Sequence, residues 1–256
     1  MNGEGLTKIV LFIEYEGTRY HGFQWQRNAA TIQGELESAL YKMTGETLRV
    51  MAASRTDAGV HALGQVASFR TSSNHTARSF VSGLNFYLPS DIAIKDACLV
   101  HNDFNVRRAA KRHYRYYIIN RPTRSPFKAR YAHLVSRQLN IEAMDQACKS
   151  LVGEQDFAPF VSNVAPIKNT VRTVYSAQMA RHGDMVTFDV MANSFLPHQV
   201  RNMMGALLKV GLDKMKVKTF QEMARCGQRG VIGPTAPACG LWLMQIDYVP
   251  PLGEAQ

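Results

Sequence analysis

Short β-rich runs alternate with segments of helical periodicity along this chain of 256 residues. The runs that predict strands lie at residues 8–15, 47–53, 65–70, 92–100, 112–119, 170–180, 185–192 and 241–248. Apolar residues at helical spacing lie at residues 32–43, 76–85, 141–151 and 197–210. Because a helical bundle has no place for so many strands, this order predicts an α+β protein with a mostly antiparallel sheet and helices packed on one face.

A basic, proline-containing stretch interrupts this pattern near the middle of the chain. Residues 121–128 include Pro122 and Pro126 among basic side chains. Such a composition is typical of a boundary and predicts an N-terminal half over residues 1–120 and a C-terminal half over residues 121–256. It also fits a simple loop within one domain.

Positive charge is concentrated in one segment of the chain. The whole chain has 30 Lys and Arg against 20 Asp and Glu, a net charge of +10, and its 46% of hydrophobic residues exclude a disordered tail. Between His101 and Arg137 the single acid is Asp103, while ten basic residues alternate with aromatic ones. Cations for phosphates and flat rings for unstacked bases predict a polyanion partner. A solvated basic face with strand aromatics in the core is the alternative.

Several classes of protein are excluded by what the sequence lacks. No apolar run approaches the roughly 18 residues of a membrane span, and the first ten residues lack the hydrophobic stretch of a signal peptide. Its four cysteines are far apart, which excludes a CxxC zinc site and a disulfide scaffold and predicts reduced, mostly buried thiols. We therefore expect a soluble, cytoplasmic protein.

The most informative segment is a polar loop between two predicted strands, residues 54–59, Ser-Arg-Thr-Asp-Ala-Gly. Arg55 and Asp57 are two residues apart, so in an extended backbone they share a face, where the guanidinium would keep the carboxylate ionised and oriented. Gly59 permits a sharp turn. The local pattern fits a catalytic loop and an ordinary turn with an incidental surface ion pair equally well.

The loop sequence, read on to Ala62 as RTDAGVHA, resembles the signature of the TruA family of tRNA pseudouridine synthases. The resemblance continues over nearly the whole chain, through residues 20–24, 31–33, 85–91, 114–116, 193–205 and 235–241. It implies the pseudouridine synthase fold, with two similar α+β halves, an extended sheet and a central basic cleft. It also implies a homodimer that isomerises uridines 38 to 40 in the anticodon stem and loop of tRNA.

By the same resemblance, Asp57 is the catalytic aspartate, Arg55 the arginine that pairs with it, and Tyr114 the tyrosine beside the target base. The reaction breaks a glycosidic bond and rejoins the same uracil through C5, so it needs no cofactor and no metal. A carboxylate can act here as a nucleophile, a base or an electrostatic stabiliser. A strand aromatic facing the core is the alternative role for Tyr114.

The target base must leave its stem, and contacts to the RNA backbone would supply the few kcal/mol that this flipping costs. The expected substrate-binding residues are Arg107, Arg108, Lys111, Arg112, Arg201, His198 and Leu241, the last in the apolar wall of the pocket. Two histidines, His61 and His198, also fit a packing or capping role. A non-catalytic tRNA-binding module or tRNA chaperone is the competing interpretation. A metal-dependent nuclease is disfavoured because clustered acidic or histidine ligands are lacking.

The chain departs from the family pattern at Ser54, Pro197 and Gln199, and none of these departures removes a catalytic group. Pro197 is suited to a first helical turn. We therefore expect a helix to begin there and to direct backbone N–H groups and Arg201 toward a phosphate.

Overall fold

The computed structural model describes residues 5–161, 167–230 and 233–252, which form two compact units. Unit 1 comprises Met1–Ala110 and Leu243–Gln256, and unit 2 comprises Lys111–Trp242. The sequence predicted a division between residues 120 and 121, whereas the compact units divide at residue 110 and the chain returns to unit 1 at its end. The basic, proline-containing stretch is a loop within unit 2.

Unit 1 is built on an antiparallel sheet. Its central strand β1 carries apolar side chains that are buried on both faces, including Ile9, Val10 and Leu11. It pairs with β4 on one side and β3 on the other, and β3 also pairs with β2 and lies next to β10. The bounds are β1 Thr7–Tyr15, β2 Met51–Ala52, β3 His61–Thr71, β4 Ile92–Val100 and β10 Leu241–Asp247.

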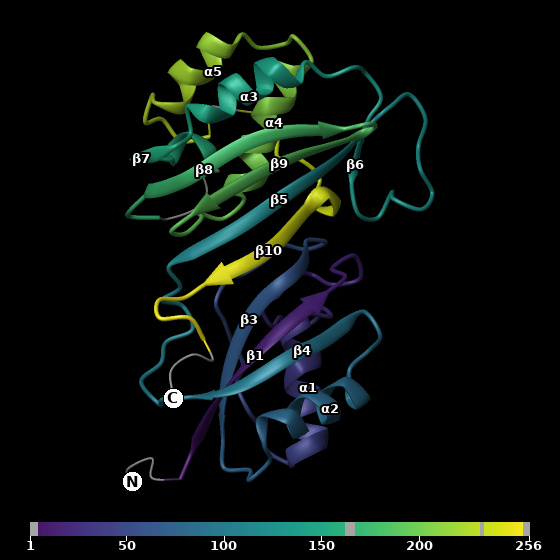
Figure 1. The fold of residues 1–256 in the computed structure, drawn as a ribbon, viewed down its shortest axis with the longest axis vertical. Coiled ribbons are helices and arrows are strands. Elements are labelled where there is room, and N and C mark those ends of the chain that lie inside the picture. Colours follow the sequence, from purple (N-terminus) through teal and green to yellow (C-terminus); the bar gives the residue numbers. More distant parts are fainter. Residues whose placement is uncertain (1–4, 162–166, 231–232, 253–256) are drawn as a thin grey trace. The chain divides into compact units, whose positions relative to one another are not determined.

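Two helices cover one face of the unit 1 sheet, α1 (Ile32–Thr44) and α2 (Ala77–Tyr87) (Figure 1). The sequence predicted the ends of α1 correctly. Thr31 Oγ1 accepts a hydrogen bond from the backbone N–H of Gly34 at 3.2 Å, and Gly45 ends the helix in the left-handed conformation.

Unit 2 has a sheet in the order β5-β9-β8-β7, with β6 beside β5. Its hairpin of β8 and β9 turns at Gly183, which has a φ of 59°, as the sequence predicted. Helices α3, α4 and α5 pack together, and α3 lies against β8 (Figure 1). The strands are β5 Lys111–Asn120, β6 His133–Val135, β7 Gly153–Asp156, β8 Val171–His182 and β9 Met185–Ala192. The helices are α3 Ile141–Lys149, α4 Gln199–Gly211 and α5 Val217–Ala224, with single 3-10 turns η1 Ala158–Phe160 and η2 Ala238–Gly240.

The predicted class is confirmed, because β1 pairs antiparallel with β3 and β4, as do β2 with β3, β5 with β9, β7 with β8 and β8 with β9, while β5 and β6 run parallel. Three details of the prediction were wrong. The strand predicted over residues 47–53 is reduced to β2, and the helix predicted from Pro197 begins at Gln199 because His198 adopts a left-handed conformation. Of the four thiols, only that of Cys148 is fully buried.

No helix in the described part of the chain is both long enough and apolar enough to cross a membrane.

Candidate active site

The polar loop that carries Asp57 joins β2 to β3, and β3 anchors the start of the loop. At its start, the backbone N–H of Ala53 donates to Val66 O at 2.8 Å. Gln65, which is fully buried, donates through Nε2 to Ser54 O at 2.8 Å. Strand β3 therefore holds the start of the loop through its own buried polar groups, so the backbone that leads to Asp57 has a defined position.

Behind the loop, residues 22–23 support the backbone at Thr56. The buried Thr56 hydroxyl lies 2.8 Å from the Tyr15 hydroxyl, and Thr56 O accepts the N–H of Phe23 at 3.1 Å. Gly22 has a φ of 92°, and a Cβ at this position would lie 2.6 Å from Thr56 O. Only glycine fits here, because both the backbone conformation and the close approach exclude a side chain.

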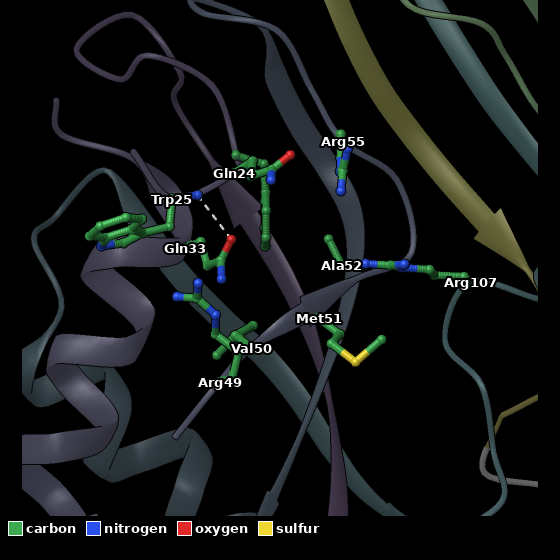
Figure 2. A pocket seen from close by; sticks show the side chains of 10 residues that line it. Gln24, Trp25, Gln33, Arg49, Val50, Met51, Ala52, Arg55 and Arg107 are labelled. Atoms are coloured by element: carbon green, nitrogen blue, oxygen red, sulfur yellow. Dashed lines mark hydrogen bonds between the residues drawn. The ribbon is translucent and has the colours of Figure 1, made fainter. Parts of the chain in front are cut away.

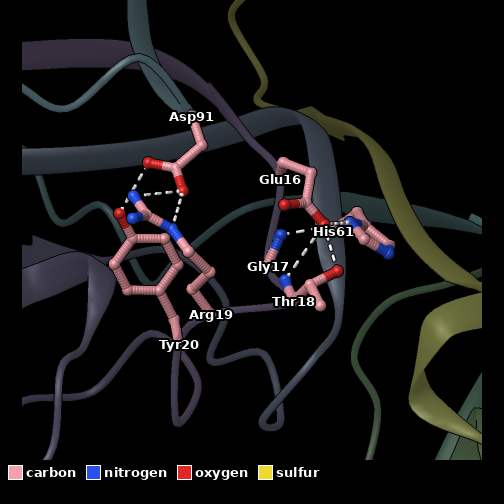
Figure 3. Close-up of polar contacts among 7 residues, drawn as sticks. All are labelled: Glu16, Gly17, Thr18, Arg19, Tyr20, His61 and Asp91. Atoms are coloured by element: carbon pink, nitrogen blue, oxygen red, sulfur yellow. Dashed lines mark hydrogen bonds and ion pairs between the residues drawn. The ribbon is translucent and has the colours of Figure 1, made fainter. Parts of the chain in front are cut away.

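Residues 16–20 form a second support, held by the polar contacts that Figure 3 shows. The N–H of Gly17 donates to His61 Nδ1 at 3.0 Å, and the His61 ring is completely buried. Tyr20 O accepts the N–H of Gly59 at 3.2 Å, so this segment contacts the turn after Asp57 directly. His61 therefore has the packing and hydrogen-bonding role that the sequence left open.

Asp91, which directly precedes β4, also holds residues 16–20 in place. It accepts from the Tyr20 hydroxyl at 2.7 Å and from Arg19 Nε at 2.7 Å (Figure 3). Burial raises the pKa of Asp91, but the hydrogen bonds from Arg19 and Tyr20 outweigh it and leave the pKa below its ordinary value. Burial and the bond to Asp91 raise the pKa of Tyr20. The cluster is thus an ionised carboxylate with a neutral phenol at pH 7.

Asp57 and Arg55 differ in their surroundings. Asp57 is half-buried in the turn, and its carbonyl oxygen accepts the N–H of Val60 at 3.2 Å. Arg55 is exposed and lines a small pocket of unit 1 (Figure 2). Among the described residues no ion pair joins the two side chains, so their pairing stays a prediction.

Tyr114 belongs to unit 2, in the middle of β5. Only 5% of it is exposed, and its ring meets that of Phe195 edge-on, with 5.2 Å between centroids. Its neighbour Tyr116 is a core residue whose hydroxyl donates to Pro237 O at 2.7 Å. Leu241, at the start of β10, is also buried.

The expected RNA-binding residues fall into two groups. Arg107, Arg108 and Lys111 are exposed. Arg112 is instead buried, and its Nη1 donates to Asn193 O at 2.5 Å, which ties β5 to the end of β9. Its role in the fold was not evident from the sequence, because the register of β5 decides which of two adjacent basic residues is exposed.

At the start of α4, Arg201 and His198 lie together in unit 2. Arg201 Nε donates to Ala236 O at 2.8 Å, and its Nη1 lies 3.4 Å from His198 Nδ1. His198 is exposed and makes no side-chain cap on the helix. The expected first turn at Pro197 is therefore absent, although Arg201 does lie in the first turn of α4.

Two groups near the loop were missed by the sequence analysis. These are Gly22, whose conformation supports Thr56, and the pair of Trp25 and Arg49, which line the same pocket as Arg55 (Figure 2). The adjacent sequence Phe-Gln-Trp-Gln-Arg at residues 23–27 carries an aromatic and polar pattern that was available as a signal. In the described part of the chain, no three His, Cys, Asp or Glu side chains are grouped so as to hold a metal ion.

Comparison with known proteins identifies the class to which this α+β chain belongs, that of the RNA-modifying isomerases. The profile of the tRNA pseudouridine synthase family matches residues 11–107 and 147–249. The chain belongs to this family and is an isomerase.

Curated relatives agree over almost the whole length. The tRNA pseudouridine synthase A of Geotalea daltonii is 42% identical over 95% of this chain and 100% of its own. Those of Exiguobacterium sp. and Herminiimonas arsenicoxydans are 41% and 40% identical, over 95% and 97% of this chain and 98% and 93% of theirs. A chain from the crystal structure of a Cbf5-Nop10-Gar1 complex is similar at a TM-score of 0.41, with 12% identity, 79% of this chain and 45% of that chain covered.

Proposed function

We propose that this isomerase converts uridine to pseudouridine at positions 38 to 40 of the tRNA anticodon stem and loop, with Asp57 as its catalytic carboxylate. The observation that carries the proposal is the position of Asp57. It stands in a loop whose start is anchored by β3 and which residues 17–23 support from behind. A carboxylate held in this way is preorganised for a reacting sugar.

The group that this reaction most requires is a carboxylate beside the sugar of the target uridine. The N1–C1′ bond of the uridine breaks, the uracil turns, and C5 bonds to C1′ while the hydrogen on C5 is lost and N1 gains a proton. A carboxylate at Asp57 would attack C1′, stabilise its positive charge or remove a sugar proton. Tyr114 would contact the uracil, and Arg55 would keep the carboxylate ionised.

Tritium release tests the catalytic role of Asp57. A tRNA transcript labelled with tritium at C5 of uracil should release tritium to water with the wild type, without added metal or cofactor. Asp57→Asn should release none, while its tRNA affinity stays within a few-fold of the wild type. Asp96→Asn, which removes an exposed carboxylate of the same unit, is the matched control and should be as active as the wild type.

Turnover by Asp57→Asn near the wild-type rate would disprove the catalytic role. Tight tRNA binding with no release by the wild type would instead favour a tRNA-binding module or chaperone. Mapping the product within the anticodon arm then tests the proposed positions 38 to 40.

We also propose that the enzyme acts in the cytoplasm as a homodimer on tRNA. Light scattering of the purified protein at assay concentration should give twice the 28.7 kDa mass of one chain. A monomer at that concentration would disprove the dimer without affecting the proposed role of Asp57.

A further inference from the structure

A small pocket of unit 1 includes Arg55 from the loop of Asp57, and its other lining residues have no role in the function proposed above. It has a volume of about 150 Å³. Its apolar floor includes Phe23 and Val50, both buried, and its rim carries Trp25 together with three arginines, Arg49, Arg55 and Arg107. In Figure 2, Arg55 and Arg107 approach the pocket from one side of the view, and Trp25 and Arg49 from the other.

The wall around Trp25 is held in place by a chain of hydrogen bonds. The backbone N–H of Trp25 donates to Gln33 Oε1 at 2.9 Å, and Gln33 Nε2 donates to Glu37 Oε1 at 2.7 Å. Glu37 also accepts the N–H of Val50 at 3.0 Å. Because Gln33 and Glu37 lie in the first turns of α1, the start of this helix fixes the backbone of Trp25.

The Trp25 side chain is held without being covered. Arg49 pairs with Glu37 at 3.1 Å, and its guanidinium lies over the Trp25 ring at 5.6 Å from the centroid. Even so, 46% of Trp25 is exposed. A large flat ring that is fixed at its backbone, backed by a cation and still open to solvent is the arrangement that stacks an unpaired base.

The positive charge of the pocket indicates which chemical group of the ligand would bind opposite Trp25. Among the described residues that line it there are three arginines and no carboxylate, and Arg49 forms an ion pair with Glu37. Arg55 and Arg107 are both exposed and line the pocket on the side opposite Trp25 (Figure 2). Guanidinium groups in this setting bind phosphate oxygens.

We propose that this pocket binds one unpaired RNA nucleotide next to the uridine that is isomerised, with its base against Trp25 and its phosphate against Arg55 and Arg107. This assignment rests on the proposed function for its substrate, because Arg55 is only two residues from Asp57. It identifies Trp25 as a substrate-positioning residue outside the loop.

Tryptophan fluorescence tests the contact directly. The chain has two tryptophans, so Trp25→Phe retains Trp242 as an internal reference. Unmodified tRNA transcript should quench wild-type emission, and most of that quenching should be absent in Trp25→Phe. Equal quenching of both proteins would overturn the proposal. Inorganic phosphate is the second probe, and wild-type quenching by phosphate equal to that by RNA would show an anion site without base stacking.

Affinity measurements separate stacking from folding. Trp25→Ala should weaken tRNA binding by about tenfold, whereas Trp25→Phe should stay near the wild type because a flat ring remains. Phe86→Ala removes an aromatic side chain that is 81% exposed on α2 of the same unit and should bind as the wild type does. Wild-type affinity of Trp25→Ala would overturn the proposal.

For the phosphate side, Arg107→Gln should reduce the salt slope of binding by about one, and Arg78→Gln on α2 should leave it unchanged. An equal slope for Arg107→Gln and the wild type would overturn the phosphate contact.

The proposed function and the proposed nucleotide pocket can fail separately. Quenching of Trp25 in a protein that releases no tritium would contradict the proposed activity at positions 38 to 40 and leave the nucleotide pocket standing, whereas normal release without Trp25 quenching would contradict the pocket alone.

Discussion

Single residues behind the loop of Asp57 determine its position as much as the residues within it. Gly22 is the clearest case, because it combines a left-handed backbone with an approach to Thr56 O that excludes a side chain. His61 acts in the same way from β3, where its ring accepts the N–H of Gly17. Neither residue has to touch RNA to affect the reaction.

We predict that Gly22→Ala destabilises the protein by about 2 kcal/mol or more and lowers turnover, because the new Cβ must displace Thr56 and with it Asp57. Urea unfolding and tritium release measure the two effects. Gly45→Ala is the control, since Gly45 is also left-handed but a Cβ there meets nothing within 4 Å. It should cost only about 1 kcal/mol and leave turnover intact. Equal effects of the two substitutions would show that the approach to Thr56 has no importance.

At the scale of elements, the sequence was most informative where periodicity and caps agreed. The strand over residues 92–100 and the helix between Thr31 and Gly45 were predicted with correct or nearly correct ends. The missed elements β6, β7 and α5 are too short for periodicity to emerge from the sequence. The predicted start of α4 was wrong because His198 adopts a left-handed conformation, so the helix begins after it despite the favourable Pro197.

Pairing of β5 with β9 also buries a charged cluster, in which Asp189 lies opposite Arg115. Asp189 Oδ1 is 2.8 Å from His113 Nε2 and 2.8 Å from Arg115 Nε. Burial raises the pKa of Asp189, but these hydrogen bonds more than reverse the shift and leave the pKa below its ordinary value. A carboxylate with a lowered pKa stabilises the fold above the unfolded-state value of about 3.9, and this contribution is lost as the pH falls through the folded-state pKa.

We therefore predict that Asp189→Asn costs about 2 kcal/mol at pH 7 and that the difference from the wild type shrinks below about pH 4. Urea unfolding between pH 3 and 7 measures the difference. Asp184→Asn, which removes a more exposed carboxylate from the turn between β8 and β9, should change stability little at any of these pH values. A constant deficit of Asp189→Asn across the range would refute the electrostatic explanation.

At the scale of the whole molecule, the sequence predicted the family and the loop but not the surroundings of each basic residue. The basic segment from His101 to Arg137 reads as one block, yet Arg112 is buried against Asn193 and Arg115 pairs with Asp189. Strand β5 alternates its faces, and only pairing with β9 decides which face is exposed. The surroundings of Arg55, which lines a pocket together with Trp25 and Arg49, likewise depend on the tertiary fold, which no local pattern contains.

Net charge and local charge make different predictions for tRNA binding. If exposed residues of the segment contact phosphates, charge reversal of Arg108 and Lys111 to Glu should weaken binding and lower the slope of log K against log salt. Reversal of Arg78 on α2 and Lys218 on α5 changes the net charge by the same amount, one exposed cation in each unit. Filter binding over 50 to 200 mM salt, about the range over which such contacts dominate, measures all three slopes.

We expect the first double variant to lose about two from the slope and the second to keep the wild-type value, because counterion release counts contacts and not total charge. Equal losses in both would mean that tRNA responds only to the overall positive field of the protein. The segment would then contribute positive charge but no contacts to particular phosphates. Selection of the target uridine would depend on the loop of Asp57 and the pocket beside it.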